Sequence, residues 1–246
     1  MEFQDLLPLI LVALVAFLYA SVGHGGASGY LALMAILGMQ PLFMRPSALI
    51  LNVFVSLVSF SQFYRAGFFR WPLFWPFALA SVPLSFVGAT LPISDSLYKK
   101  LLAAALLIAV ARMVFQNTKQ PARVFFGAYK LPISLLVGAV IGLLSGMLGI
   151  GGGIILTPVL LLLGWGGLKE VAAVSALFIF TNSVAGFAGL LTKGYTPVPL
   201  TFWWLGAALI GGLAGAYYGS QKYNLPTLRY ALTAGLLIAI GKLFFT

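Results

Sequence analysis

The chain alternates between long apolar runs and short stretches that carry charge, proline or glycine. Ten apolar runs cover residues 6–22, 27–38, 46–64, 72–91, 97–115, 131–147, 153–164, 171–192, 198–218 and 228–245. A helix needs roughly 20 residues to cross a hydrocarbon core of roughly 30 Å, and most of the runs approach or reach that length. The runs at 27–38 and 153–164 would extend only about 18 Å as helices, and each follows a glycine cluster. The pattern predicts an all-α polytopic membrane protein of 8–10 transmembrane helices, with glycine-broken or re-entrant segments at 23–29 and 149–153.

The ten runs form two sets of five in which the same features recur in the same order. A shift of 130 residues places 106–110 over 236–240, and a shift of 126 residues places 23–26 over 149–152. A longer loop near 165–170 absorbs the difference between the two shifts. The sequence therefore predicts an internal duplication, with a first membrane repeat at 1–116, a basic connection at 117–130 and a second membrane repeat at 131–246.

The composition agrees with a membrane protein and excludes other classes. Hydrophobic residues make up 61% of the chain and charged residues 7%, whereas a soluble domain has about a quarter of its residues charged and a disordered chain is poor in aliphatic residues. The absence of cysteine excludes disulfides, thiolate metal sites and iron–sulfur clusters, and we expect neither a metal nor a cofactor. The first apolar run is expected to stay in the mature protein, because Glu2 and Asp5 precede or flank it and no basic residue does.

The 14 basic residues are scattered singly or in pairs between apolar runs, which indicates topology determinants and argues against nucleic-acid binding. With an odd number of crossings in each repeat, one side would hold Arg65, Arg70, Arg112, Lys119, Arg123, Lys130, Lys169, Lys222 and Arg229. The other side would hold Arg45, Lys99, Lys100, Lys193 and Lys242. This split of nine to five is more asymmetric than the eight to six of an even count. It predicts two inverted repeats, both termini in the periplasm and the 117–130 connection in the cytoplasm.

The strongest local motif is the stretch 149–158, where four glycines and one isoleucine interrupt an apolar run. Its residues with candidate roles are Gly149, Gly151, Gly152, Gly153, Thr157 and Pro158. Glycines break a helix inside the membrane and leave backbone N–H groups unshielded at the positive start of the next helix, which is a binding site for an anion. Thr157 and Ser145 could add hydroxyl donors. The competing interpretation is close helix packing through small residues, but interrupted segments at matching places in two repeats favour a transporter site.

The first repeat carries a degenerate copy of this motif. Its candidate residues are Gly23, His24, Gly25, Gly26 and Ser28. His24 is the only histidine of the chain, and an imidazole at membrane depth is suited to proton coupling or to direct anion binding. A histidine that is simply hydrogen-bonded within the packing remains an equal alternative.

Asn52 and Asn182 are the polar centres of the third run in each repeat. Ser56 and Ser59 follow Asn52 on one helical face, and Ser175 shares a face with Asn182. Such a stripe either lines a substrate path or makes hydrogen bonds between helices. The four acidic residues, Glu2, Asp5, Asp95 and Glu170, all lie at or near the ends of runs, so a cation transporter is disfavoured.

The paired glycine clusters resemble the sulfite exporter TauE/SafE family, also called the toluenesulfonate uptake permease family. The resemblance covers nearly the whole chain. It is closest at 149–158, which matches the family's glycine-rich element followed by proline, and at 173–177. The first repeat departs from this pattern, since His24 and Ser28 lie inside its cluster and Ala32 stands where Pro158 has its counterpart. The resemblance implies transport, more commonly export, of a sulfur-containing anion such as sulfite or an organosulfonate across the bacterial inner membrane.

The hypothesis that combines these features is a secondary carrier whose two glycine breaks bind an oxyanion through backbone amides, with His24, Asn52 and Asn182 among the side-chain donors. Its partners would be a small anion and the lipid bilayer, and the sequence leaves monomer and homodimer open. A passive anion channel with the same site is the alternative. A third hypothesis, an intramembrane serine protease, rests on the Gly-x-Ser-Gly pattern at 26–29, but its one available base, His24, lies four residues from Ser28 in the same segment.

Overall fold

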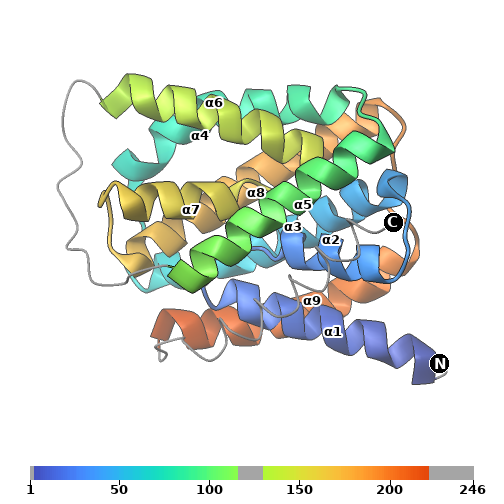
Figure 1. The fold of residues 1–246 in the computed structure, drawn as a ribbon. Coiled ribbons are helices and arrows are strands. Elements are labelled where there is room, and N and C mark those ends of the chain that lie inside the picture. Colours follow the sequence, from blue (N-terminus) through green and yellow to red (C-terminus); the bar gives the residue numbers. More distant parts are fainter. Residues whose placement is uncertain (1–2, 116–129, 222–246) are drawn as a thin grey trace.

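The computed structural model describes residues 3–115 and 130–221, and these residues form nine α-helices and no strand (Figure 1). The helices of the first half are α1 (Phe3–Ala20), α2 (Ala27–Ile36), α3 (Pro41–Arg65), α4 (Trp71–Thr90) and α5 (Asp95–Phe115). Those of the second half are α6 (Lys130–Leu148), α7 (Gly153–Leu162), α8 (Leu168–Thr192) and α9 (Leu200–Gln221). Nine of the ten predicted runs are thereby confirmed as helices. The run at 228–245 and all but the last residue of the predicted connection lie outside the described residues.

The predicted boundaries differ most at the start of α3, which begins at Pro41 and not at residue 46. Proline is well suited to the first turn of a helix because its fixed φ is already helical and its missing N–H would have had no partner there. Gln40 precedes it in an extended conformation, with φ −73° and ψ 144°. The prediction had treated Arg45 and Pro46 as a boundary, but both are buried inside the helix.

Five of the described helices are long and apolar enough to cross a membrane. They are the helices at Pro41–Arg65, Trp71–Thr90, Leu131–Leu148, Leu168–Thr192 and Leu200–Gln221. Large apolar side chains on their outer faces are exposed, including Leu136 at 68%, Trp203 at 72% and Ile210 at 72%. Exposure of so many large apolar side chains is unfavourable in water and natural in lipid, so the structure agrees with the predicted multi-pass membrane protein.

The outer helix pairs are held together by glycines of the second half. In α6, Gly138, Gly142 and Gly146 lie directly against the backbone carbonyls of Phe77, Ser81 and Ser85 in α4. In α9, a second set with the same spacing of four residues lies against the α1 segment; its members are Gly211, Gly215 and Gly219. A Cβ atom at any of these six positions would overlap a carbonyl oxygen. Helices in lipid associate by such close backbone packing, so these glycines allow the close contact of α4 with α6 and of α1 with α9.

We expect Gly142→Leu to prevent formation of the α4–α6 pair, because the new side chain would have to displace the Ser81 backbone. Overpacking against a backbone destabilises by about 3 kcal/mol or more. The matched control is Gly206→Leu in α9, where the residue is exposed and no atom lies within 4 Å of the position that a Cβ would take. The measurement is the yield of monodisperse protein by size-exclusion chromatography in detergent. Equal yields for the two variants would contradict the role of Gly142.

The centre of the molecule is the crossing of α3 and α8. Asn52 is bonded to Ser183, and Leu49 lies beside Gly186, so the two helices run antiparallel where they touch. Both helices are largely buried, and both carry small polar side chains on the buried face. The short helices α2 and α7 lie next to this pair, as Figure 1 shows. The glycine breaks that precede α2 and α7 therefore meet the central helices.

Candidate functional site

Each short helix is preceded by a residue whose positive φ strongly favours glycine. Gly26 precedes α2 with φ 98°, and Gly152 precedes α7 with φ 79°, both in the left-handed region. Each of the two helices has ten residues, or about 15 Å, half the thickness of a hydrocarbon core. The chain reverses direction at each break (Figure 1). Two helix N-termini, each with its positive end of the dipole, are thus held inside the apolar part of the protein.

Asn52 in α3 joins the first break to the second repeat. Its Oδ1 accepts a hydrogen bond of 3.1 Å from the backbone N–H of Ala27, the first residue of α2. Its Nδ2 donates a hydrogen bond of 2.8 Å to Ser183 Oγ in α8. A Cβ atom at Gly25 would overlap Asn52 Oδ1, and one at Gly151 would overlap Asn52 Nδ2. Both breaks therefore contact the same amide side chain.

His24 forms a second connection between the repeats. Its Nδ1 lies 3.0 Å from the Val22 carbonyl oxygen, which can only accept, so Nδ1 carries the proton. In the neutral ring Nε2 is then an acceptor, and Thr157 Oγ1 donates to it over 3.2 Å. Since the Thr157 proton is used in that bond, Ser175 Oγ donates to Thr157 over 2.7 Å. The result is a chain of hydrogen bonds from the first break through α7 to α8.

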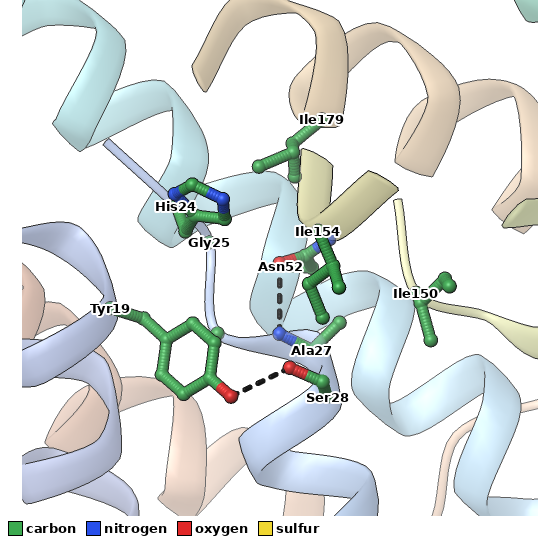
Figure 2. A pocket seen from close by; sticks show the side chains of 10 residues that line it. Tyr19, His24, Gly25, Ala27, Ser28, Asn52, Ile150, Ile154 and Ile179 are labelled. Atoms are coloured by element: carbon green, nitrogen blue, oxygen red, sulfur yellow. Dashed lines mark hydrogen bonds between the residues drawn. The ribbon is translucent and has the colours of Figure 1, made fainter. Parts of the chain in front are cut away.

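A pocket lies between these two connections (Figure 2). Its lining residues are Tyr19, His24, Gly25, Gly26, Ala27, Ser28, Asn52, Ile150, Ile154 and Ile179. The free space at these residues is about 160 Å³, part of it open to the surroundings, and it is too narrow for a water molecule. Polar groups from the first repeat occupy one wall and isoleucines of the second repeat the other, as Figure 2 shows. The pocket is therefore closed in this conformation, and a bound anion requires the two walls to separate.

Beside each of the two breaks lies a buried hydroxyl that has no hydrogen-bond partner among the described residues. The Tyr30 hydroxyl is 2.8 Å from the position of a Cβ on Gly26, and it has no partner among the described residues. Ser145 Oγ likewise has none in the described part of the chain, and the Ser145 Cβ lies 3.5 Å from the corresponding position on Gly152. A buried hydroxyl left unpaired is unfavourable by about 1–3 kcal/mol. Each helix N-terminus is thus accompanied by a buried hydroxyl without a partner among the described residues, although neither residue lines the pocket.

The structure brings most of the predicted site residues together. Gly25, Gly26, Ser28, His24 and Asn52 line the pocket. On the other side, Gly149, Gly151, Gly152 and Gly153 form the second break and the start of α7, and a Cβ on Gly153 would lie 3.6 Å from His24 Cδ2. Thr157 reaches His24 from inside α7. Gly23 lies one residue before His24, packed against the Ala172 backbone of α8.

Asn182 and Pro158 occupy different environments. Asn182 Oδ1 accepts from Ser81 Oγ over 2.7 Å and its Nδ2 donates to the Phe178 carbonyl over 2.8 Å, so its side chain joins α8 to α4. The repeat counterpart of Asn52 therefore does not reach the start of α7. Pro158 lies inside α7, where its missing N–H leaves the carbonyl of Ile154 without the usual helical donor.

The Ser28 hydroxyl is used in a structural bond. Ser28 Oγ donates its proton to the Tyr19 hydroxyl over 2.7 Å (Figure 2). Because a hydroxyl has one proton, it does not donate to His24, and His24 Nε2 in turn accepts from Thr157. The pair does not have the nucleophile–base arrangement of a serine hydrolase.

Three polar residues of this region were not predicted from the sequence. Tyr19 and Ser183 are the partners of Ser28 and Asn52. Arg45 was counted only as a topology determinant, yet it is 7% exposed and contacts the second break. A signal for Ser183 was present, since it follows Asn182 directly, but which of the two side chains faces α3 depends on the rotation of α8.

Comparisons with known proteins agree with this architecture. The family described as "Sulfite exporter TauE/SafE" matches residues 8–243. A relative from Sinorhizobium fredii, called "Probable membrane transporter protein y4hK", is 35% identical over 94% of both chains. A relative from Methanocaldococcus jannaschii, "Probable membrane transporter protein MJ0441", is 26% identical over 81% of this chain and 82% of its own. One from Bacillus subtilis, "Probable membrane transporter protein YdhB", is 25% identical over 89% and 91%. No solved structure gives a significant match.

Proposed function

Because the chain belongs to the sulfite exporter TauE/SafE family, whose members are membrane transporters and not enzymes, we propose that it is a secondary transporter that exports a sulfur-containing anion, such as sulfite or an organosulfonate, across the bacterial inner membrane. The family description supports the substrate class and the direction. The observation that carries the proposal is the meeting of two helix N-termini at one buried amide, Asn52, next to hydroxyls that lack partners among the described residues.

The anion would bind to backbone amides at the two breaks. The N–H groups of Gly153 and Ile154, the first two residues of α7, have no intrahelical acceptor because no helical carbonyl precedes them. At α2 the first such amide, on Ala27, is already bonded to Asn52 Oδ1. Asn52 thus holds the start of α2 beside the second break, and the anion would bind at this junction. Such sites bind anions without a charged side chain.

Inverted repeats would provide the movement. The two central helices, α3 and α8, are equivalent in the predicted duplication and cross antiparallel, which supports an inverted relation between the repeats. The outer pairs are also reciprocal, since the fourth helix of each repeat packs against the first helix of the other. Rocking of one repeat against the other would widen the closed pocket first to one side and then to the other. The arrangement with both termini in the periplasm stays a prediction. Several of the basic residues that were counted on the cytoplasmic side lie at 119–129 and 222–229, outside the described residues.

His24 is the candidate for proton coupling. In its neutral form Nε2 accepts from Thr157. Protonation would make Nε2 a donor, so the Thr157 hydroxyl would have to turn its proton toward Ser175 or toward a bound anion. The added positive charge would also lie within the anion site and strengthen binding. Proton uptake and anion binding would therefore favour each other.

The test is flux in liposomes that contain the purified protein. We expect saturable sulfite flux that is inhibited by a small organosulfonate more strongly than by sulfate, and that increases with an imposed pH gradient. His24→Gln keeps a hydrogen-bonding side chain but cannot be protonated, so it should keep flux and lose most of its dependence on the gradient. Wild-type liposomes without sulfite or organosulfonate flux would contradict the proposed substrate. Flux that neither saturates nor shows counterflow exchange would identify a passive channel instead.

A further inference from the structure

Arg45 is a buried cation beside the second glycine break. It lies in the second turn of α3 and is 7% exposed. Its Nη2 donates hydrogen bonds of 3.1 Å to the carbonyl oxygens of Ala89 and Gly146, near the C-terminal ends of α4 and α6. These carbonyls carry only the partial negative charge of a helix end, about half a unit for each helix. They orient the guanidinium but do not neutralise it fully.

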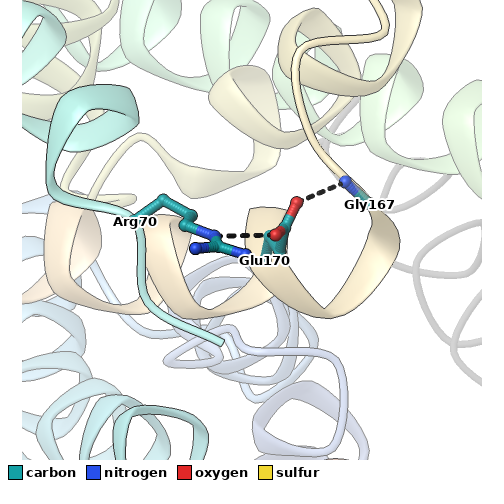
Figure 3. A network of polar contacts seen from close by, with 3 residues as sticks. All are labelled: Arg70, Gly167 and Glu170. Carbon is teal, nitrogen blue, oxygen red and sulfur yellow. Dashed lines mark hydrogen bonds and ion pairs between the residues drawn. The ribbon is translucent and has the colours of Figure 1, made fainter. Parts of the chain in front are cut away.

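No carboxylate whose side chain the structure describes is paired with Arg45. The full sequence has four acidic residues; Asp95 is exposed, and Glu170 is bonded to Arg70 at the other end of α8 over 2.8 Å (Figure 3). The Nε of Arg45 is buried and has no hydrogen-bond partner among the described residues. A buried charge without a counter-charge is strongly unfavourable in a membrane protein and generally has a functional reason.

The contrast with Arg70 shows why Arg45 is unusual. Arg70 is 62% exposed, and its partner Glu170 also accepts from the Gly167 N–H over 3.0 Å, which caps the start of α8 (Figure 3). Each charge of that pair is neutralised by the other, and the pair contributes at most about 1 kcal/mol to the stability of the protein. Arg45 is more deeply buried and has no such acid among the described side chains. Its environment therefore lacks a counter-charge, which a bound anion could supply.

The position of Arg45 connects it to the pocket. Gly149, the first residue of the second break, lies beside it: a Cβ there would be 3.3 Å from the Arg45 Cα. Gly151 lies beside Asn52 in the same way. Arg45 and Asn52 are seven residues apart on one face of α3, which is about 10 Å along the helix. The second break therefore runs along α3 from Arg45 to the pocket, and Arg45 lies on the side where α3 begins.

We propose that Arg45 is a second binding point for the transported oxyanion, between the pocket and the membrane face at which α3 begins. The inference rests on the proposed function in that the ligand is the same anion. The Nε–H of Arg45, which has no partner among the described residues, would donate to one oxygen of a sulfur oxyanion, and the anion supplies the missing counter-charge. The carbonyls of Ala89 and Gly146 hold the guanidinium in place while the anion arrives from the pocket or leaves it.

The experiment compares Arg45→Gln with Lys193→Gln, which removes an exposed positive charge at the end of α8 near the same face. Two quantities are measured: the KM of sulfite flux in liposomes, and the increase in melting temperature that sulfite causes in detergent. We expect Arg45→Gln to raise KM at least tenfold and to lose most of the sulfite-induced shift, whereas Lys193→Gln stays within twofold of wild type. Arg45→Lys, which keeps the charge but not the Nε donor, should raise KM to an intermediate value.

The outcomes separate this inference from the proposed function. Wild-type flux with an unchanged KM and an unchanged shift in Arg45→Gln would overturn the role of Arg45 and leave the transporter intact. If Arg45→Gln does not yield folded protein, Arg45→Lys decides by the same two measurements, and wild-type values would overturn the inference. If wild type transports none of the tested anions, the proposed function fails. The increases in melting temperature that sulfite and sulfate cause in wild type and in Arg45→Gln then still decide whether Arg45 binds an oxyanion. If neither anion raised the melting temperature of wild type, the role of Arg45 would be contradicted.

Discussion

Gly152→Val is expected to reduce sulfite flux by at least about 100-fold while the protein still inserts and folds. Gly152 has φ 79°, which is unfavourable by about 1–2 kcal/mol for a residue with a Cβ. A Cβ there would also lie 2.8 Å from Ile141 Cγ2, closer than real Cβ contacts, and 3.0 Å from Phe178 Cε1, so both neighbours would have to move. The start of α7 must then shift, and with it the amides of Gly153 and Ile154. A displacement of about 1 Å in a binding site is sufficient for an effect of this size.

The control is Gly67→Val, in the connection between α3 and α4. Gly67 has φ 80°, so valine meets the same backbone strain, but nothing lies within 4 Å of its Cβ position. We expect a small loss of thermal stability in both variants and a loss of flux only in Gly152→Val. Flux near the wild-type value in a folded Gly152→Val protein would remove the second break from the site. Equal loss in both variants would mean that backbone strain alone, and not the local geometry at α7, is responsible.

The helices and their breaks were predictable because their physical causes are local. Runs of apolar residues long enough to span a membrane need no tertiary information to be recognised. Clusters of neighbouring glycines, such as 23–26 and 149–152, disfavour a continuous helix, and the structure has glycines with positive φ in both. The sequence also held the signal for helix pairing. Gly138, Gly142 and Gly146 recur every four residues, which indicates a close contact along one helical face, although the partner helix cannot be named from that spacing.

The sequence pointed to several residues that line the pocket, but not to the hydrogen bonds that connect them. The two asparagines are equivalent in the repeat, yet Asn52 binds the start of α2 whereas Asn182 binds Ser81 in α4. This difference arises from how each helix is rotated against its neighbours, which a repeat pattern does not record. Arg45 was misjudged for a related reason: charge counting assumes that basic residues near helix ends lie in water, and here the ends of α4 and α6 cover it.

That difference between the asparagines leads to the second prediction. We expect Asn52→Ala to lower sulfite flux by about 100-fold or more, because the side chain connects three parts of the site. Without Oδ1 the Ala27 N–H loses its acceptor, and without Nδ2 the bond to Ser183 in α8 is lost. Breaking two buried hydrogen bonds and leaving their partners unpaired is unfavourable by about 1–3 kcal/mol for each group. Loss of these two bonds would let the amides at the start of α2 move out of position and would weaken the contact between the two repeats.

Asn182→Ala is the matched comparison, since it removes the same chemical group at the equivalent place in the other repeat. It also breaks two bonds, to Ser81 and to its own helix at Phe178, but neither group lines the pocket. We therefore expect both variants to lower the melting temperature by a similar amount, and only Asn52→Ala to raise KM and reduce the sulfite-induced melting shift. If the two variants raised KM equally, the second repeat would contribute its asparagine to the substrate path as the first does. The closed pocket would then be only one half of a larger site that forms when α4 and α8 separate.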